Sequence, residues 1–425
     1  MKPFSAEKLY TLLTNLTPAR HFLVAYSGGL DSHVLLHSLT QLRETDPEIS
    51  LRAIHFHHGL NTQADQWTEH CLRVCTDLGI DYQWKYLTLS LKKGESLENL
   101  ARMARYKACR TILKEDELLL TGHHQNDQAE TLLLQLLRGA GPKGLAAMPV
   151  YSNFAHTKLI RPLLNFTRPS LETYARKHRL QWIEDSSNQE LTFDRNFIRH
   201  ELLPLIQKRW PSALTTLARS ASHCAEATML LAQTADAELL TLQGSAPHTL
   251  SVQNLRELNP PKQSLVIRRW LEHRHLPIPS QTKLMQIIRE ILPCRDDAMP
   301  KVQWQGAEIR RYRDDLYAFT PFLPINSSLI ISWDLKTILK LPGDLGVLIP
   351  QECKQSPLYT NGPITVRFRQ GGEYCQPVGS KTRRSLKNLF QEWGIPPWQR
   401  QRIPLLYQKE KIIQIPGYCV CTDDS

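Results

Sequence analysis

The chain has 425 residues, enough to bury large hydrophobic cores and to form two to three domains. Its formal charge of +11, from 52 Lys and Arg against 41 Asp and Glu, favours a polyanionic partner, above all a nucleic acid. Nine scattered cysteines without a C-x-x-C pair argue against a zinc ribbon, an iron–sulfur cluster or a secreted disulfide framework, so we expect buried reduced thiols. No apolar run approaches the ~18 residues of a membrane-spanning helix, and no signal-peptide core is apparent, which predicts a soluble cytoplasmic protein.

The alternation of apolar runs predicts strands and helices in turn over the first half of the chain. Helices are expected at 5–16, 63–78, 96–113 and 128–138, and strands at 22–26, 51–56, 82–87 and 118–121. Such an alternation indicates right-handed crossovers and an α/β fold with a doubly wound parallel sheet. Ligands of these sheets bind beyond the carboxyl ends of the strands. Five histidines follow strands there and are more typical of hydrogen-bonded pocket walls than of metal ligands: His55, His57, His58, His123 and His124.

The first strand is followed at once by Ser-Gly-Gly-Leu-Asp-Ser at residues 27–32 and then by helical periodicity. A phosphate fits such a turn, because backbone N–H groups converge there and the helix dipole favours negative charge. Gly28 and Gly29 allow an anion to approach the main chain closely. Asp31 is expected to cap the helix or to hold a metal bound to the phosphates. No Lys follows, so this is not a Walker loop; an ordinary turn with a serine cap is the alternative.

Charged residues on the next helices have two interpretations each. Glu98, Arg102 and Arg105 form a stripe that is either a solvated, salt-bridged face or a source of one arginine aimed at phosphate. Asp127 and Glu130 have the spacing of a capping box. The same geometry brings Asp127 to the mouth of the sheet, where a carboxylate can hold Mg²⁺ against nucleotide phosphates.

The segment after residue 185 begins with a loop of capping residues and continues into a helical turn. Arg195, Asn196 and Arg199 then share that turn, which suits an RNA backbone or an adenylate phosphate; an exposed helix face is the alternative. Further helices are predicted at 212–243, 261–273 and 280–292, and short strands at 301–305 and 307–319.

The last part of the chain is basic, with ten Lys and Arg against five Asp and Glu over residues 361–425. Basic side chains cluster near aromatic ones, at Arg367, Arg369, Lys381, Arg383, Arg384 and Lys387 and at Tyr374, Phe390, Trp393 and Trp398. Basic groups hold phosphates and aromatic rings stack on unpaired bases, so RNA binding is one interpretation. The other is a small domain whose aromatic residues form its core.

The glycine-rich hexapeptide resembles the PP-loop of ATP pyrophosphatases, and further motifs narrow the resemblance to the tRNA(Ile)-lysidine synthetase family in its long form. These motifs occur in order at 27–32, 55–60, 98–106, 122–131, 138–149, 161–162, 184–188, 195–199, 203–204, 369–373, 386–390 and 395–398. One position departs from the family pattern, because Asn126 stands where the first of two adjacent aspartates is usual. If both carboxylates bind metal, affinity should be weaker here.

The resemblance implies a PP-loop domain at 1–211, a mostly helical tRNA-binding domain at 212–325 and a basic, small α+β tRNA-binding domain at 326–425 with a linker near 326–357. It implies joining of L-lysine to the wobble cytidine, position 34, of CAU-anticodon tRNA(Ile), with ATP and Mg²⁺ as cofactors. An adenylated cytidine is the intermediate, and pyrophosphate and AMP are released. The product, lysidine, changes decoding from AUG to AUA and aminoacylation from Met to Ile.

The resemblance also implies roles for single residues. The catalytic ones are Asp31, Arg105 and Asp127, with Asp31 and Asp127 as Mg²⁺ ligands. The ATP-binding ones are Ser27, Gly28, Gly29, Leu30, Asp31, Ser32, His55, Gly122 and His123. The tRNA-binding ones are Arg195, Asn196, Arg199, Arg369, Lys381, Arg383, Arg384 and Lys387. No membrane and no obligate protein partner are implied, and a homodimer is possible. Alternatives are a thiolating PP-loop enzyme, an amidotransferase-type synthetase and a non-catalytic RNA-binding protein.

Overall fold

The structure is a computed structural model that describes residues 3–59, 62–88, 97–295, 298–353, 358–359 and 362–422. The chain divides into two compact units, Met1–Leu231 and Ala232–Ser425. Leu60 of the histidine motif and the side chains of Glu98 and Ser186 lie outside the described residues. The three-domain division expected from sequence stays a prediction. Among the described residues no helix combines the length and apolarity needed to span a membrane.

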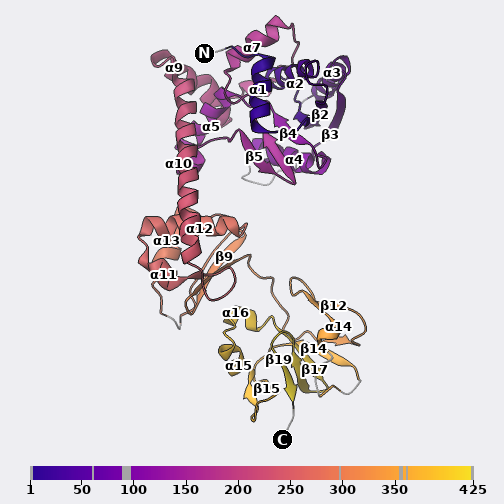
Figure 1. Ribbon diagram of the computed structural model, residues 1–425, viewed down its shortest axis with the longest axis vertical. Coiled ribbons are helices and arrows are strands. Elements are labelled where there is room, and N and C mark those ends of the chain that lie inside the picture. Colours follow the sequence, from indigo (N-terminus) through magenta and orange to yellow (C-terminus); the bar gives the residue numbers. More distant parts are fainter. Residues whose placement is uncertain are drawn as a thin grey trace. The chain divides into compact units, whose positions relative to one another are not determined.

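A six-stranded sheet forms the centre of the first unit, in the order β3–β2–β1–β4–β6–β5 (Figure 1). Its strands are β1 (His21–Ala25), β2 (Ser50–His57), β3 (Asp81–Tyr86), β4 (Leu118–Thr121), β5 (Tyr151–Phe154) and β6 (Thr157–Ile160). β1 pairs in parallel with both β2 and β4, and only β5, at one edge, runs antiparallel. The predicted doubly wound sheet is confirmed, with two strands that were not predicted, the parallel β6 and the antiparallel β5. The strand order reverses between β1 and β4, which is where such folds bind ligands.

Helices cover both faces of this sheet because side chains alternate along its central strand. Phe22, Val24 and Tyr26 pack into one core, and Leu23 packs into the other together with Ala108. The helices of this unit are α1 (Ala6–Leu16), α2 (Leu30–Leu42), α3 (Ala64–Asp77), α4 (Leu97–Ile112), α5 (Gln125–Leu137), α6 (Pro142–Leu145), α7 (Arg168–Lys177), η1 (Ser186–Gln189), α8 (Asp194–Phe197), η2 (Ile198–Leu202) and α9 (Leu203–Arg209). The helix boundaries expected from periodicity hold within a few residues.

The long helix α10 (Ala213–Thr241) belongs partly to each unit. Within its described residues, the second unit contains two larger antiparallel sheets and one two-stranded sheet. The first has the order β7–β10–β9–β8, from β7 (Leu250–Ser251), β8 (Lys301–Trp304), β9 (Ala307–Tyr312) and β10 (Asp315–Phe319). It shares a core with α11 (Val252–Glu257), α12 (Pro260–His273), α13 (Gln281–Gln286) and η3 (Ile287–Ile291). This part therefore combines helices with the short strands that the sequence predicted.

The second sheet has the order β11–β14–β17–β18–β19–β15–β16. Its strands are β11 (Ile331–Trp333), β14 (Ile364–Phe368), β15 (Tyr374–Pro377), β16 (Arg384–Ser385), β17 (Pro404–Gln408), β18 (Lys411–Ile415) and β19 (Cys419–Thr422). The hairpin of β12 (Leu339–Lys340) and β13 (Val347–Leu348) and the helices α14 (Pro350–Cys353), α15 (Leu386–Glu392) and α16 (Pro397–Arg400) complete this α+β region. Trp398 of α16 packs against the rings of Tyr317 and Phe319.

The cysteines depart in one respect from the expectation of reduced thiols. Cys71, Cys75 and Cys109 are buried and free, as predicted. Cys375 and Cys421, however, form a disulfide. Forty-six positions separate them, and only the pairing of β15 with β19 brings them together.

Candidate active site

The segment 27–32 forms a compact turn between β1 and α2, held by its own serines. The backbone N–H of Ser27 donates to the Ser32 hydroxyl at 3.2 Å, and that hydroxyl donates to the Gly29 carbonyl at 3.0 Å. Gly29 is the N-cap of α2, with no side-chain cap, so the expectation that Asp31 caps this helix is wrong. Asp31 instead lies in the first turn, because the helix begins one residue earlier. The uncapped start leaves N–H groups for an anion.

Two glycines in this region are required by close packing. Gly28 has a φ of +82°, and an added Cβ would lie 2.5 Å from Cδ1 of Ile183. A Cβ on Gly122, after β4, would lie 3.0 Å from the backbone nitrogen of Ser32. The turns that follow β1 and β4 therefore touch backbone to backbone at the switch point of the sheet.

A cleft of about 850 Å³ opens above these turns. Of the predicted ATP-binding residues, all but Gly28 line it; Gly28 lies behind the turn, where Ile183 donates its N–H to the Gly28 carbonyl at 2.9 Å. Arg105 lines the cleft as well, together with Arg102 of the same helix face. The structure thus brings the PP-loop, the strand-end histidines and the arginine stripe of α4 into one cavity.

Three histidines of the cleft, His58, His123 and His124, have perturbed pKa values of opposite direction. Burial lowers the pKa of His58 to about 4 and that of His123 to about 3, so both rings are neutral near pH 7. Burial also opposes charge on His124, but the carboxylates of Asp127 and Asp31 outweigh it and raise the pKa of His124 above its ordinary value. Its Nε2 atom lies 3.4 Å from Asp31 Oδ2 and 3.6 Å from Asp127 Oδ2. The Nε2 side of the His124 ring therefore faces two catalytic candidates, Asp31 and Asp127.

The capping-box interpretation of Asp127 and Glu130 is wrong. The N-cap of α5 is His124, whose Nδ1 accepts from the N–H of Asn126, and Asp127 at N3 accepts from the His124 N–H at 3.0 Å. The capping box therefore consists of His124 and Asp127, three residues earlier than the predicted pair. His124 escaped detection because Ser, Thr, Asp and Asn are the usual N-cap residues.

Glu130 points instead into a buried ion network with two arginines. Arg195 donates to Glu130 Oε2 at 2.8 Å and to Asp127 Oδ1 at 2.9 Å. Arg199 donates to Glu130 Oε1 at 2.7 Å and to Asp127 Oδ1 at 3.2 Å. The Glu130 side chain is only 1% exposed, so two cations must accompany its charge. His124 and Arg195 also hold the pKa of Asp127 well below its ordinary value, although burial opposes this.

The arginine pair and Asn196 point in different directions, although sequence spacing suggested one face. Asn196 is buried and donates to the carbonyls of Ser187 and Glu190, which ties the preceding loop to α8. All three residues still line the cleft. Their role in tRNA binding stays a prediction. Both arginines already pair with carboxylates, so a phosphate would compete with Asp127 and Glu130 for them.

Asn126, the departure from the family pattern, has a structural contact. Its side-chain oxygen accepts from the N–H of Arg168, the first residue of α7, at 3.1 Å. A neutral amide thus joins α5 to α7 at the rim of the cleft.

The predicted metal ligands differ in their availability. Asp31 has a buried carboxylate oxygen, Oδ1, without a hydrogen-bond partner, which suits a hard cation such as Mg²⁺. Both oxygens of Asp127 are already engaged, by the His124 N–H and by the two arginines. Asp127 would have to give up an arginine contact to bind a metal.

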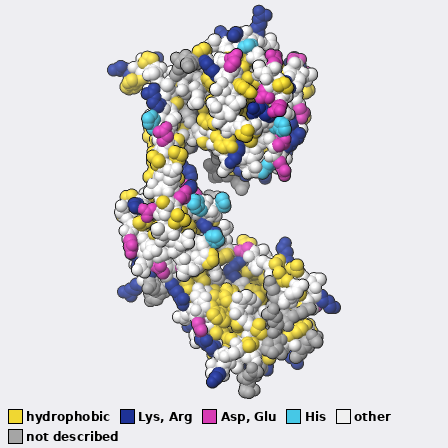
Figure 2. Space-filling view, viewed as in Figure 1, with side chains coloured by type: hydrophobic (Ala, Val, Ile, Leu, Met, Phe, Trp, Pro, Cys, Tyr) yellow, Lys and Arg dark blue, Asp and Glu magenta, His cyan; other side chains and the backbone are white. Residues whose placement is uncertain are grey.

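The predicted basic residues of the C-terminal part are only partly exposed to solvent. Lys381, Arg383 and Lys387 are exposed, whereas Arg384 pairs with Glu392 and Arg369 lies over the ring of Phe390. Figure 2 shows Lys and Arg side chains on the visible surface of this region among hydrophobic ones.

Most of the aromatic residues named with this basic cluster form core contacts. Phe390 is fully buried, and Trp393 stacks on Tyr418. Tyr374 is about half exposed and therefore remains available for stacking on a base.

Comparison with known proteins agrees with this architecture. The chain matches a PP-loop domain family over residues 1–206, a TilS substrate binding domain over 250–317 and a TilS substrate C-terminal domain over 364–424. A tRNA(Ile)-lysidine synthase from Coxiella burnetii is 46% identical over 421 residues, which cover 98% of this chain and 93% of the relative. That of Yersinia pseudotuberculosis is 42% identical, covering 97% of this chain and 94% of the relative.

Among solved structures, a U34-tRNA thiolase from Methanococcus maripaludis has a TM-score of 0.46 and 17% identity, covering 52% of this chain and 77% of that one. The parallel sheet, the glycine turn and the cleft at its switch point define an ATP-using enzyme of the PP-loop class. Within that class, the extent of the matches over the whole chain is decisive. The chain belongs to the tRNA(Ile)-lysidine synthase family.

Proposed function

We propose that the protein ligates L-lysine to cytidine 34 of CAU-anticodon tRNA(Ile), using ATP and forming lysidine. The single observation that carries this proposal is the near full-length similarity to tRNA(Ile)-lysidine synthases, which includes both tRNA-related domains. The modification changes the codon read from AUG to AUA and the amino acid from Met to Ile.

The first step activates the base. The cytosine carbonyl oxygen attacks the α-phosphorus of ATP, the bond to the leaving pyrophosphate breaks, and an adenylated cytidine forms. The N–H groups at the start of α2 and the hydroxyls of Ser27 and Ser32 are suited to hold the pyrophosphate. Arg105, exposed at the cleft wall, is suited to neutralise charge that develops on the phosphate.

The second step replaces the activated oxygen. The amine of lysine bonds to the cytosine carbon, the carbon–oxygen bond to AMP breaks, and the amine loses its proton. Asp127 lines the cleft, and Arg195 and Arg199 hold it together with the buried Glu130. Neutral His58 and His123 accept hydrogen bonds there without repelling a cationic substrate.

Mg²⁺ is the expected companion of ATP, and when bound it neutralises charge on the phosphates. Asp31 is the candidate ligand with an unpaired buried oxygen, and Asp127 is the second candidate. Lys381, Arg383 and Lys387 are candidates for contacts with tRNA phosphates. We also propose a cytoplasmic location, where tRNA and ATP meet, and leave a homodimer as a possibility to be measured.

Thiolation of a tRNA base is less well supported. Among the described residues that line the cleft, the cysteine is Cys109, and its burial raises its pKa to about 12. Within the described residues, three cysteines converge only in the C-terminal sheet and not at the cleft. A persulfide or cluster mechanism needs reactive thiols beside the nucleotide.

The test is incubation of the protein with ATP, labelled L-lysine and CAU-anticodon tRNA(Ile), with elongator tRNA(Met) as the matched control. We expect label in tRNA(Ile) alone, with one pyrophosphate released per lysine. Equal labelling of both tRNAs would refute the specificity, and labelling without ATP would refute the adenylate route.

A further inference from the structure

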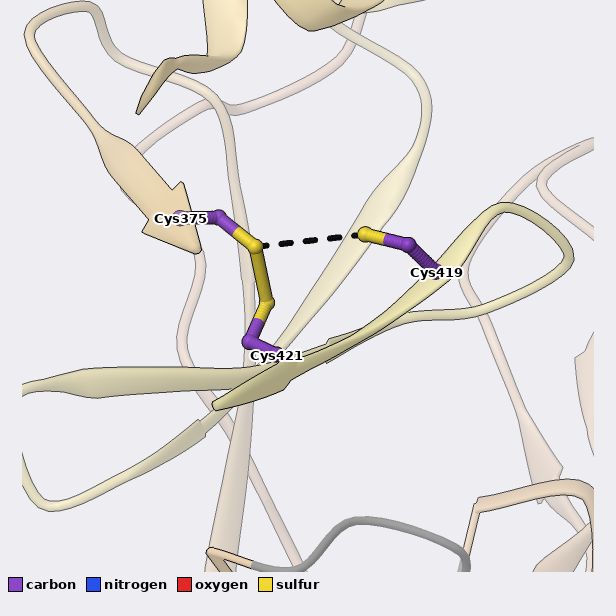
Figure 3. Close-up of side chains that lie close together, drawn as sticks. All are labelled: Cys375, Cys419 and Cys421. Carbon is purple, nitrogen blue, oxygen red and sulfur yellow. Dashed lines mark hydrogen bonds between the residues drawn. A yellow bond between two sulfur atoms is a disulfide. The ribbon is translucent and has the colours of Figure 1, made fainter. Parts of the chain in front are cut away.

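Three cysteines that are far apart in sequence converge in the C-terminal sheet (Figure 3). Cys375 of β15 and Cys421 of β19 are joined as a disulfide, and the Cys419 thiol lies 3.9 Å from the Cys375 sulfur. The three sulfur atoms lie within 4.8 Å of one another. Within the described residues, no other group of three His, Cys, Asp or Glu side chains is close enough to share a cation.

The strands themselves build this cluster. Cys419 and Cys421 are two positions apart on β19, so their side chains leave the same face of the strand. β15 pairs antiparallel with β19, with Pro377 opposite Cys421, which brings Cys375 alongside. Cys375 and Cys421 are at most 2% exposed, and Cys419 is partly buried against the same core. The convergence is therefore a fixed property of the fold.

A permanent disulfide does not suit the location proposed above. The cytoplasm keeps thiols reduced, and clustered cysteines in cytosolic proteins more often bind metal than form structural bridges. Zn²⁺ binds thiolates at about 2.3 Å, so tetrahedral geometry places two sulfurs about 3.8 Å apart. The 3.9 Å between Cys375 and Cys419 matches this spacing. Reduction of the disulfide frees the Cys421 sulfur to move to a similar distance, about 3.8 Å, from the Cys375 sulfur.

We propose that the reduced protein binds a thiophilic divalent cation of the Zn²⁺ class between Cys375, Cys419 and Cys421, and that the disulfide is the oxidised form of this site. A thiol reductant supplies two electrons and two protons, which convert the disulfide to two thiols; with a phosphine, the phosphine supplies the electrons and water supplies the protons and the oxygen of the phosphine oxide. The cation then replaces the three thiol protons. The cluster supplies three ligands and leaves one tetrahedral position for water. Bound metal ties β15 to β19 and so stabilises the C-terminal sheet.

Thiol–disulfide exchange is the rival use of the same residues. It requires the Cys419 thiolate to attack the Cys375 sulfur and expel Cys421. Exchange moves the disulfide between pairs of the same three cysteines and takes up no cation, so metal uptake by the reduced protein distinguishes the two uses.

The experiment uses the full-length protein, reduced with a phosphine under argon and titrated with Zn²⁺ and, separately, Co²⁺. We expect one equivalent of Zn²⁺ by native mass spectrometry and a sulfur-to-cobalt charge-transfer band. Zn²⁺ should also raise the unfolding temperature of the reduced protein, and chelation should reverse this. Failure of the reduced protein to take up either ion would overturn the proposal.

Variants sharpen the test. Cys419→Ser removes a partly exposed ligand and leaves the Cys375–Cys421 pair intact, so this variant should fold. Loss of a residue that only supports a ligand weakens metal binding by roughly 10–100-fold, so loss of the ligand itself should weaken Zn²⁺ binding by more than that. Cys224→Ser, on α10, is the matched control and should bind as the parent does. Equal Zn²⁺ affinity of both variants would reject the site. Lysine ligation is not a readout, so failure here leaves the proposed function untouched.

Discussion

The Nε2 atom of His124 lies 3.4 Å from Oδ2 of Asp31, which joins the first turn of α2 to the N-cap of α5. These two helix starts carry the PP-loop and the carboxylate network. The Nε2 side of the imidazole lies between the carboxylates of Asp31 and Asp127 and reduces the repulsion between them. The pH response of this link is measurable.

We expect His124→Asn, which keeps a good N-cap residue, to change the pH dependence of stability. Folding raises the His124 pKa above 6.5, so its stabilisation is fully present below pH 6.5 and is lost as the pH rises through the higher folded-state value. The difference in unfolding free energy between parent and variant should therefore shrink on going from pH 6 to pH 9. Urea denaturation of both proteins at several pH values between about 6 and 9 measures this difference. Exposed His223→Asn is the control, and a pH-independent difference for His124→Asn would contradict the assignment.

Gly28→Ala should damage both folding and ATP use. The left-handed φ costs about 1–2 kcal/mol for a residue with a Cβ, and the new atom would collide with Ile183. Gly79→Ala is the matched control, since Gly79 also has a positive φ but open space around it. Urea denaturation should give a larger loss for Gly28→Ala, and tRNA-dependent pyrophosphate release should fall for that variant alone. Equal losses in both would show that packing against Ile183 is unimportant.

Arg105→Ala should slow formation of the adenylated base by roughly 10²–10³-fold, the range seen when one preorganised electrostatic contact is removed. Lys107→Ala, exposed on the same helix and outside the cleft lining, should leave the rate unchanged. Single-turnover pyrophosphate release at saturating tRNA separates this chemistry from binding. A parent-like rate for Arg105→Ala would remove the residue from the mechanism.

Asp31→Asn should raise the Mg²⁺ concentration needed for half-maximal pyrophosphate release by at least tenfold, because Asp31 has the unpaired carboxylate oxygen. Asp127→Asn should act differently. It leaves Arg195 and Arg199 short of a counter-charge and should lower stability by about 3–5 kcal/mol. Magnesium titrations and urea denaturation of both variants distinguish the roles. If only Asp127→Asn raised the Mg²⁺ concentration needed for activity, Asp127 and not Asp31 would be the metal ligand.

Arg383→Ala should weaken tRNA binding and reduce the slope of log affinity against log salt concentration by about one, as expected for loss of one phosphate contact. Arg367→Ala is the comparison, because Arg367 already pairs with Glu410. Filter binding at several salt concentrations measures both slopes. An unchanged slope for Arg383→Ala would exclude that contact.

The sequence predicted the class of the sheet but not the ion network. Strands and helices alternate along the chain, so a doubly wound parallel sheet could be predicted, whereas the strand order is known only from the structure. Glu130 was assigned to a capping box because i, i+3 spacing at a helix start is common to caps and to inward-facing pairs. Its partners, Arg195 and Arg199, lie 65 or more positions away. Only tertiary packing reveals that two arginines four residues apart match one buried carboxylate.

The disulfide exposed a similar limit. Connectivity among nine cysteines cannot be deduced from spacing, and Cys375 gave no local signal of a partner. By contrast, the chemistry of residues 27–32 is local. The glycine turn at a helix start therefore predicted an anion site there, and the absent lysine excluded a Walker loop.

The contact of Gly122 with the backbone of Ser32 has a consequence for how nucleotide is captured. Since the two main-chain segments abut with no side chain between them, the turn proposed to hold the departing diphosphate has its shape before any ligand arrives. Little conformational entropy of the chain is then lost when the diphosphate binds, so more of the binding free energy is available to stabilise the transition state.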